Sequence, residues 1–306
     1  MSAFMTSAYA QHSPFAGRWD LTLQPQAGTP YPQWLEVVEK DGALTGQFQP
    51  RGGAARPLLA AKTEGAHLIL TLAEATARNP VTTWDLTTAD DKLTGVEKQG
   101  DAAGPKVSGV RAPALKRSMP KAWTAPKAIF NGKDLAGWEP LGTAPNKWIA
   151  RDGELVNDNP VVDGQHNSPA ANLRTVGKFQ DFKLHIEVDC PEGGNSGIYL
   201  RGRYEIQVGT EGGSNPSHEM GALYGHFAPA SPGRKLGQWS TFDITFVGRY
   251  LTVLRDGVKI HDNVEVPGPT GGALDSNESE PGPFFLQGDH HGVIRYRNIT
   301  IQAPKK

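Results

Sequence analysis

Short runs in which polar and apolar residues alternate, separated by turn residues, constrain this chain more than any other feature. Residues 17–23, 34–39 and 44–48 are such runs, and a period of two is that of a β-strand. Asp41-Gly42 and Asp256-Gly257 each separate two of these runs, and Asp-Gly favours the tight turn of a hairpin. No long stretch has helical periodicity. The sequence therefore predicts an all-β protein of short antiparallel strands.

Composition supports this fold class and excludes several kinds of partner. Gly 36 and Pro 24 are abundant without a repeat, which suits many strands joined by turns. The 31 basic residues nearly cancel the 32 acidic residues, so we expect no nucleic-acid partner. No apolar run is long enough to span a bilayer. Cys190 is the single cysteine, and its phase with the apolar positions 182–188 predicts a small buried side chain.

The order of the runs predicts two domains. Residues 14–112 are expected to form a small antiparallel β-barrel or sandwich, an accessory domain. Residues 113–126 contain Pro113, Pro120, Pro126 and three basic residues, as in a stiff solvated linker. Residues 127–303 are expected to form two packed antiparallel sheets, one with a concave face. Long Gly-, Pro- and Asn-rich loops near 157–175, 209–238 and 266–283 are candidates for function.

The most polar stretch of the second domain is interpreted as one strand over residues 197–208. Strand alternation then places five polar side chains on one face: Tyr199, Arg201, Arg203, Glu205 and Gln207. Guanidiniums donate to hydroxyl groups, while a carboxylate and an amide accept from them. This face is predicted to be the floor of a polar ligand groove, with a solvated salt-bridge ladder as the alternative.

Two histidine clusters are further candidates for chemistry. Asp289-His290-His291 follows Gln287, and an Asp-His pair next to glycine can bind a metal or act as an oriented base. His218 and His226 lie with Tyr224 in the long loop after the polar stretch, where a histidine can close over a substrate. The alternatives are ordinary surface histidines and hydrogen bonds that only stabilise the loop.

A third pattern suggests a different enzyme. The spacing of Glu187, Asp189 and Glu192 matches the nucleophile and acid/base signature of laminarinase-like glycoside hydrolases. Pro191 and Gly193-Gly194 surround Glu192, however, so this residue is expected in a turn.

The beginning of the chain suggests export. Ala8-Tyr9-Ala10 resembles a signal-peptidase site, although no apolar segment precedes it. Together with a sugar-directed function, this predicts a periplasmic or secreted protein.

Several segments of the second domain, in order, resemble the 3-keto-disaccharide hydrolase family, formerly a family of unknown function. They are residues 129–138 (IFNGKDLAGW), 195–208 (NSGIYLRGRYEIQV), 237–239, 256–258, 268–270, 286–290 and 296–299. The resemblance covers nearly the whole domain and implies a concanavalin A-like jelly roll.

The resemblance implies cleavage of sugars that are already oxidised at carbon 3. The ketone acidifies the C2 proton, so a base can remove it and the group at C1 leaves by β-elimination. Hydration then completes a net hydrolysis. His290, His218 and Glu205 are the expected catalytic residues, and a divalent metal on Glu205, Asp289 and His290 would polarise the ketone. The expected sugar contacts are Tyr199, Arg201, Arg203, Gln207, Tyr224 and Gln287. A non-catalytic sugar-binding module and a laminarinase-like enzyme remain alternatives, and the oligomeric state stays open.

Overall fold

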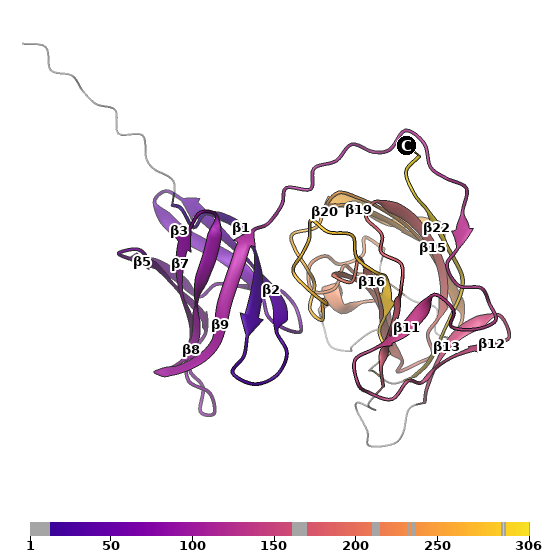
Figure 1. Cartoon of the computed structure of the whole chain (residues 1–306), viewed down its shortest axis with the longest axis horizontal. Coiled ribbons are helices and arrows are strands. Elements are labelled where there is room, and N and C mark those ends of the chain that lie inside the picture. The colour runs from indigo at the N-terminus through magenta and orange to yellow at the C-terminus, as the bar shows by residue number, and fades with distance from the viewer. Residues whose placement is uncertain are drawn as a thin grey trace, which may run out of the picture. The chain divides into compact units, whose positions relative to one another are not determined.

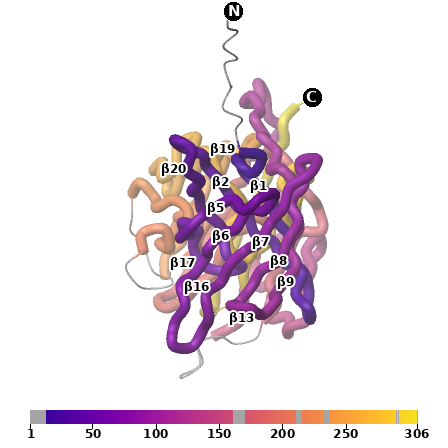
Figure 2. The backbone as a smooth tube through the Cα atoms, turned by 90° about the vertical axis from the view of Figure 1, so that its left-hand side faces the viewer, coloured from indigo at the N-terminus to yellow at the C-terminus, as the bar shows by residue number. Residues whose placement is uncertain are grey.

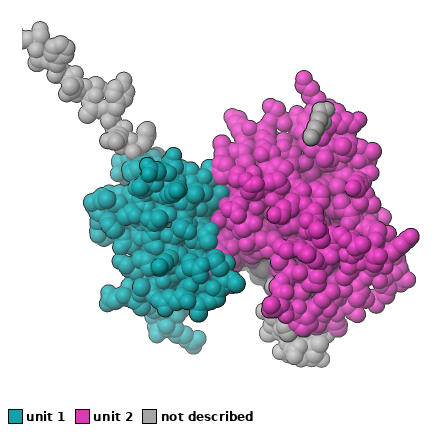
Figure 3. Space-filling model, viewed as in Figure 1, with its two compact units in different colours: residues 1–30, 34–48, 56–112 teal, residues 31–33, 49–55, 113–306 magenta. Residues whose placement is uncertain are grey.

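The computed structural model describes residues 13–160, 170–209, 215–231, 233, 237–288, 290 and 292–305. The described residues form two compact units (Figure 3). The first contains the residues up to 112, apart from 31–33 and 49–55, and the second contains those two segments and everything from 113 onward. The exported-protein prediction rests on Ala8-Tyr9-Ala10, which lies outside the described residues.

The first unit is an antiparallel meander of nine strands. They are β1 (Gly17–Gln24), β2 (Tyr31–Lys40), β3 (Ala43–Gln49), β4 (Arg56–Pro57), β5 (Ala60–Glu64), β6 (His67–Ala73), β7 (Thr82–Ala89), β8 (Lys92–Gln99) and β9 (Ala102–Arg111). Their order is β4-β3-β2-β1-β9-β8-β7-β6-β5, and Figure 2 shows β6 to β9 following one another across this unit.

The two end strands of this sheet, β4 and β5, are joined by the consecutive residues Leu58 and Leu59, which connect the two edges and close the sheet into a barrel. Leu58 N–H donates to Gly46 of β3, and Leu59 N–H donates to Thr71 of β6. Leucine and tryptophan side chains fill the interior, among them Trp19 and Trp84, both fully buried. A closed barrel leaves no open sheet edge, so this small unit avoids edge-to-edge pairing.

The second unit is a sandwich of two antiparallel sheets (Figure 1). The eight-stranded sheet contains β10 (Lys127–Ala128), β12 (Trp148–Arg151), β13 (Glu154–Asn159), β15 (Phe182–Asp189), β18 (Trp239–Val247), β19 (Tyr250–Arg255), β20 (Val258–Glu265) and β22 (Gly292–Gln302). The five-stranded sheet contains β11 (Trp138–Leu141), β14 (Asn172–Thr175), β21 (Phe285–Leu286), β16 (Asn195–Leu200) and β17 (Tyr204–Gly209). In the described part of the chain, the short 3₁₀ turn η1 (Pro216–His218) is the one helical element. The all-β, jelly-roll prediction is confirmed.

Alternate residues of both sheets form the core between them. On β15, the side chains of Phe182, Leu184, Ile186 and Val188 point inward, and Cys190 continues this buried series as predicted. The predicted Asp-Gly turn between β19 and β20 is also confirmed, because Asp256 and Gly257 have φ of 51° and 77°. Each sheet therefore keeps a second face, directed away from the core.

The prediction of one strand over residues 197–208 is wrong. The stretch is a hairpin, in which β16 and β17 pair from Asn195↔Gly209 to Leu200↔Tyr204. Arg201 and Gly202 turn the chain with φ of 54° and 72°, a backbone region that glycine adopts without steric cost. The Arg-Gly pair between two alternating runs was the signal for this turn.

The model contains no helix, among the residues it describes, that is long and apolar enough to cross a bilayer.

Candidate functional site

Polar side chains gather on the face of the five-stranded sheet that points away from the core. The hairpin loop has three residues, so position 199 pairs with 205 and position 197 pairs with 207. Tyr199, Glu205 and Gln207 therefore still share one face, as predicted, while Ile198 and Ile206 point into the core. Phe285 of β21 extends this face, because it pairs with Tyr199 and the two rings stack at 3.7 Å.

Glu205 is a carboxylate held at the centre of this face. Tyr199 Oη lies 2.7 Å from Glu205 Oε2 and 2.9 Å from the Gly271 carbonyl oxygen, so its single proton is shared between these two acceptors. Thr270 Oγ1 accepts the Glu205 backbone N–H at 3.0 Å. Glu205 is only 2% exposed. A buried carboxylate is costly unless it is hydrogen-bonded, and here the fold supplies a donor from the opposite strand.

Gly197 makes room for this carboxylate. A Cβ atom at position 197 would lie 2.1 Å from Glu205 Oε1 and 2.8 Å from its Cδ. Any side chain at position 197 would therefore displace the Glu205 carboxylate. The glycine of the segment Asn195-Ser-Gly197 is thus required by the site rather than by the turn of the chain.

Gln207 and Gln287 continue the face on either side of Gly197. Gln207 Nε2 donates to Asn195 Oδ1 at 2.6 Å, and the Gln287 backbone N–H donates to the Gly197 carbonyl. Gln287 Oε1 is buried and accepts no hydrogen bond from any residue that the structure describes. An acceptor of this kind suits a ligand hydroxyl group.

The loop after β17 brings His218 to the same place. Leu223 pairs with Ile206 and enters the core, so the next residue, Tyr224, points to the polar face. The Tyr224 backbone N–H donates to the Glu205 carbonyl at 3.0 Å. The ring of His218 stacks on that of Tyr224, with centroids 4.7 Å apart and planes 21° apart. The structure therefore brings together His218, Tyr224 and Glu205.

His226 has a different position and serves the loop itself. Burial lowers the pKa of its imidazole to about 4, partly opposed by hydrogen bonds to the backbone of Pro269 and Gly268. It is therefore neutral near pH 7 and connects this loop to the loop after β20. His226 therefore fits the alternative interpretation of the loop histidines, in which their hydrogen bonds stabilise the loop.

The expectation that Arg201 and Arg203 share the polar face is wrong, because both lie in the hairpin turn. Arg201 is fully buried and donates to the carbonyls of Gln180 and Gly248 and to Asp181. Burial lowers its pKa to about 10. Arg203 is also buried, and donates to Asp275 and to the Glu280 carbonyl. Both guanidiniums therefore hold neighbouring loops through these hydrogen bonds.

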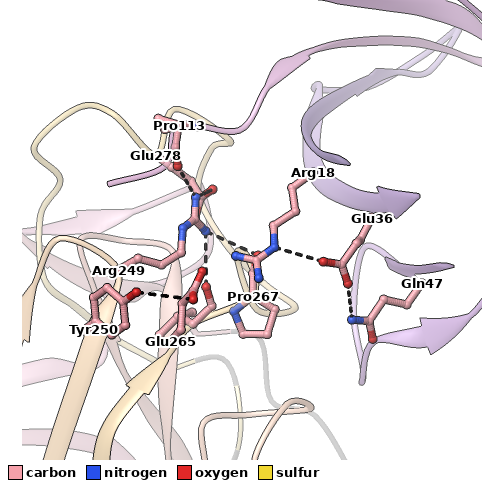
Figure 4. Close-up of polar contacts among 10 residues, drawn as sticks. Arg18, Glu36, Gln47, Pro113, Arg249, Tyr250, Glu265, Pro267 and Glu278 are labelled. Carbon is pink, nitrogen blue, oxygen red and sulfur yellow. Dashed lines mark hydrogen bonds and ion pairs between the residues drawn. The ribbon is translucent and has the colours of Figure 1, made fainter. Parts of the chain in front are cut away.

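A buried ion pair fixes the loop after β20, which passes over the polar face. Arg249 Nη1 and Nη2 donate to the two oxygens of Glu278 at 2.9 and 2.8 Å (Figure 4). Tyr204 Oη donates to Glu278 Oε1 at 2.6 Å. The side chains of Arg249 and Glu278 are 1% and 0% exposed. This bidentate pair holds the loop that supplies Thr270 and Gly271 to the site.

His290 lies two residues before β22, and its backbone carbonyl accepts from Asn159 Nδ2. Asp289 and His291 lie outside the described residues. Among the residues that the structure describes, no three His, Cys, Asp or Glu side chains are grouped to hold a metal ion. The donor set of Glu205, Asp289 and His290 therefore stays a prediction, and no step below depends on a metal.

The laminarinase-like alternative gains no support from the structure. Glu187 lies on β15 in the other sheet, where Arg297 Nε and Asn298 Nδ2 donate to it. Asp189 pairs with Arg295, and Glu192 is exposed in the turn before β16. Glu187 and Asp189 therefore form ion pairs on the eight-stranded sheet, and Glu192 does not join them.

Sequence reasoning missed three contributors to the site. They are Phe285, Asn195 and Thr270. Asn195 and Thr270 belong to the segments 195–208 and 268–270 that resemble the family, and this resemblance was the signal that could have indicated them. Phe285 lies in an apolar run and gave none.

Comparison with known proteins decides the family. A family model described as a 3-keto-alpha-glucoside-1,2-lyase-like domain matches residues 125–302, more than half of the chain. The chain belongs to this family. The predicted resemblance is thereby confirmed, and it places this family member among the carbohydrate-active enzymes.

Individual relatives match less of the chain or match it more distantly. A 3-keto-disaccharide hydrolase of Bacteroides thetaiotaomicron is 33% identical over 73 residues, which are 23% of this chain and 25% of that protein. This match thus spans a quarter of the relative's length. Two structures from Parabacteroides distasonis, provisionally described as glycosyl hydrolases, are 18% and 23% identical, with TM-scores of 0.46 and 0.39. They cover 58% and 54% of this chain, and 92% and 98% of their own.

Proposed function

We propose that this family member cleaves the glycosidic bond of 3-keto-glycosides at the polar face of the five-stranded sheet. The observation that carries the proposal is the arrangement of Glu205, Tyr199, Tyr224 and His218. Tyr199 Oη is hydrogen-bonded to the Glu205 carboxylate, the Tyr224 backbone N–H donates to the Glu205 carbonyl, and the His218 ring stacks on that of Tyr224.

The reaction needs a base for the C2 proton and an acid for the leaving group. A base removes the proton, the C2–H electrons form an enediolate with the C3 ketone, and the C1–O bond breaks. The leaving oxygen takes up a proton, and water then adds across C1 and C2 to give the 3-keto sugar. The first step is made possible by the ketone, which delocalises the charge.

His218 is the residue that we propose for proton transfer. Its ring is only partly buried, and imidazole is the side chain that most often transfers protons in enzymes. Tyr224 orients the ring by stacking. Gln287 Oε1 and Gln207 are placed to accept from sugar hydroxyls.

The test compares a 3-keto-glucoside with its unoxidised parent. We expect cleavage of the keto form alone, and a fall of about 10²–10⁴-fold in kcat for His218→Gln. Glu205→Gln should lower kcat as well. The matched control is His67→Gln, which removes an exposed histidine paired with Asp85 in the first unit.

Other outcomes decide between the alternatives. Binding without cleavage indicates a sugar-binding module, and cleavage of the parent indicates an ordinary glycosidase. Bound metal, measured on the purified protein and on the Glu205→Gln and His290→Ala variants, tests the predicted ion. Unchanged turnover in both the His218 and Glu205 variants refutes this site.

A further inference from the structure

A second polar surface lies on the opposite side of the sandwich, on the outer face of the eight-stranded sheet. The apolar residues of β15, β18 and β22 alternate into the core, so the residues between them point outward. Two cross-strand rows result, Thr300–His185–Asp243 and Gln302–Lys183–Thr245. None of these six residues belongs to the site described above.

These rows enclose a hollow of about 250 Å³. It is lined by the side chains of the two rows, with Leu184, Ile244 and Leu254 completing the wall. Pockets for drug-sized ligands begin at about 300 Å³, so this hollow suits a single small ring.

A pair of hydrogen-bonded groups stands in the hollow. His185 Nδ1 and Asp243 Oδ1 are 2.7 Å apart, and the two side chains are 36% and 50% exposed. Because the carboxylate accepts the proton of Nδ1, the imidazole is held in one orientation with Nε2 pointing elsewhere. On its other side, His185 Nε2 lies 3.9 Å from Glu187 Oε1, a carboxylate already paired with Arg297.

An aromatic ring lies beside Lys183, one of the residues that line the hollow. Trp123 forms a bridge with Pro304, two residues beyond Gln302, and Lys183 Nζ lies 5.2 Å from the centroid of its ring. The tryptophan is half-buried, so part of its surface stays exposed beside this lysine. An amphipathic ring beside hydroxyl, amide and carboxylate groups suits a ligand with both apolar C–H faces and hydroxyl groups.

The charges of the lining select against an ionic ligand. Lys183 and Asp243 offset each other, His185 is hydrogen-bonded to Asp243, and Thr245, Thr300 and Gln302 are neutral donors and acceptors. A phosphate or a polyanion would meet the Asp243 carboxylate without a compensating cluster of cations. The hydroxyl groups of a neutral sugar ring both donate and accept hydrogen bonds, and the lining offers acceptors and donors for them.

We propose that this hollow binds one neutral sugar ring, as an accessory saccharide site on the side of the sandwich opposite to the candidate active site. The two sites are separated by both sheets and the core between them. A saccharide bound here therefore does not contact Glu205 or His218. The proposal does not depend on the reaction proposed above, because its test measures binding.

The test is a titration of the full-length protein with three unoxidised disaccharides, cellobiose, maltose and trehalose, followed by saturation-transfer NMR and calorimetry. We expect saturable binding of at least one of them. Asp243→Asn and Trp123→Ala should each weaken it about tenfold or more, the effect of losing one hydrogen bond to a charged group or one aromatic contact. Asp262→Asn, an exposed carboxylate on β20 paired with Lys259, is the matched control and should bind like the original protein.

The same titration separates the two sites. Binding that persists in Glu205→Gln and is lost in Asp243→Asn places the ligand in the hollow, whatever the turnover of 3-keto-glucosides proves to be. Binding that is lost in Glu205→Gln and unchanged in Asp243→Asn and Trp123→Ala overturns the proposal. The absence of binding of all three disaccharides overturns it as well. Circular dichroism of each variant establishes that the sheet is intact.

Discussion

Gly197→Ala is the sharpest test of the candidate active site, because it adds one methyl group directly beneath the Glu205 carboxylate. The new Cβ would lie 2.1 Å from Glu205 Oε1, whereas ordinary van der Waals contact begins at 3.4 Å. The backbone at Gly197 does not have positive φ, so alanine adopts it without strain. The perturbation is therefore steric and local: the carboxylate must retreat by more than 1 Å.

The cost follows from three contributions. Overpacking costs about 1–3 kcal/mol. Losing the hydrogen bond from Tyr199 to the carboxylate costs about 1.5–3 kcal/mol, while replacing glycine restores about 0.4–1 kcal/mol through the unfolded chain. We therefore expect a net destabilisation of about 2–5 kcal/mol. At roughly 2–4 °C per kcal/mol for a unit of this size, the second unit should melt about 4–20 °C lower.

Activity should fall more than stability suggests. A displacement of about 1 Å in an active site can cost about 10²-fold in rate. We expect Gly197→Ala to lower the kcat for a 3-keto-glucoside by at least that factor. Steady-state kinetics and calorimetry of the second unit's transition measure both effects.

A shorter acid provides the matched rescue. Glu205→Asp withdraws the carboxylate by one methylene, so the double variant Gly197→Ala/Glu205→Asp should melt higher than Gly197→Ala alone. Near-normal melting and turnover of Gly197→Ala would refute the reasoning, because they would mean that Glu205 does not lie over Gly197. A rescue that restores stability without activity would support the packing and show that the position of the carboxylate is what turnover requires.

Three further predictions concern the supports of the site. Glu278→Gln leaves the Arg249 guanidinium buried without its charged partner and should lower the free energy of unfolding by about 3–5 kcal/mol. Tyr204→Phe removes one hydrogen bond and should lower it by about 1.5–3 kcal/mol. Equal melting temperatures of the two variants would contradict this order. His226 has a folded pKa of about 4, below its ordinary value, so its contribution to stability is present above pH 6.5 and is lost as the pH falls toward 4, up to about 3 kcal/mol. His226→Gln should therefore flatten the pH dependence of the free energy of unfolding between pH 6.5 and pH 4. An unchanged pH dependence would show that it does not come from His226. Arg201→Lys should lower the melting temperature, because lysine cannot reproduce three directed donors, and leave the KM for a 3-keto-glucoside unchanged; a raised KM at normal stability would return Arg201 to the binding site.

Much of the fold could be predicted from local patterns. The period of two, the Asp-Gly turns and the phase of Cys190 each depend on residues close together in the chain, and all of them are confirmed. The polar face was predicted only in part. Tyr199, Glu205 and Gln207 share it because a three-residue loop preserves the odd-numbered alternation across the hairpin.

The arginines show why the remainder could not be predicted. Arg201 and Arg203 have the correct phase in the sequence, but they occupy the turn, and their partners lie at Gln180, Gly248, Asp275 and Glu280. No local pattern reveals that a guanidinium has partners tens of residues away. The same limit applies to Thr270 and Phe285, which reach the site through the loop and strand that follow β20.

The sequence by itself determined most of the strands, the Asp-Gly turns, the family and a polar face containing Glu205. These are local properties, or properties of ordered motifs, and they survive without knowledge of the packing. Only the tertiary structure decided which polar groups share the outer face of the five-stranded sheet and which hold neighbouring loops. That distinction depends on desolvation and on hydrogen-bond partners from distant strands, which exist only once the two sheets and their loops have packed together.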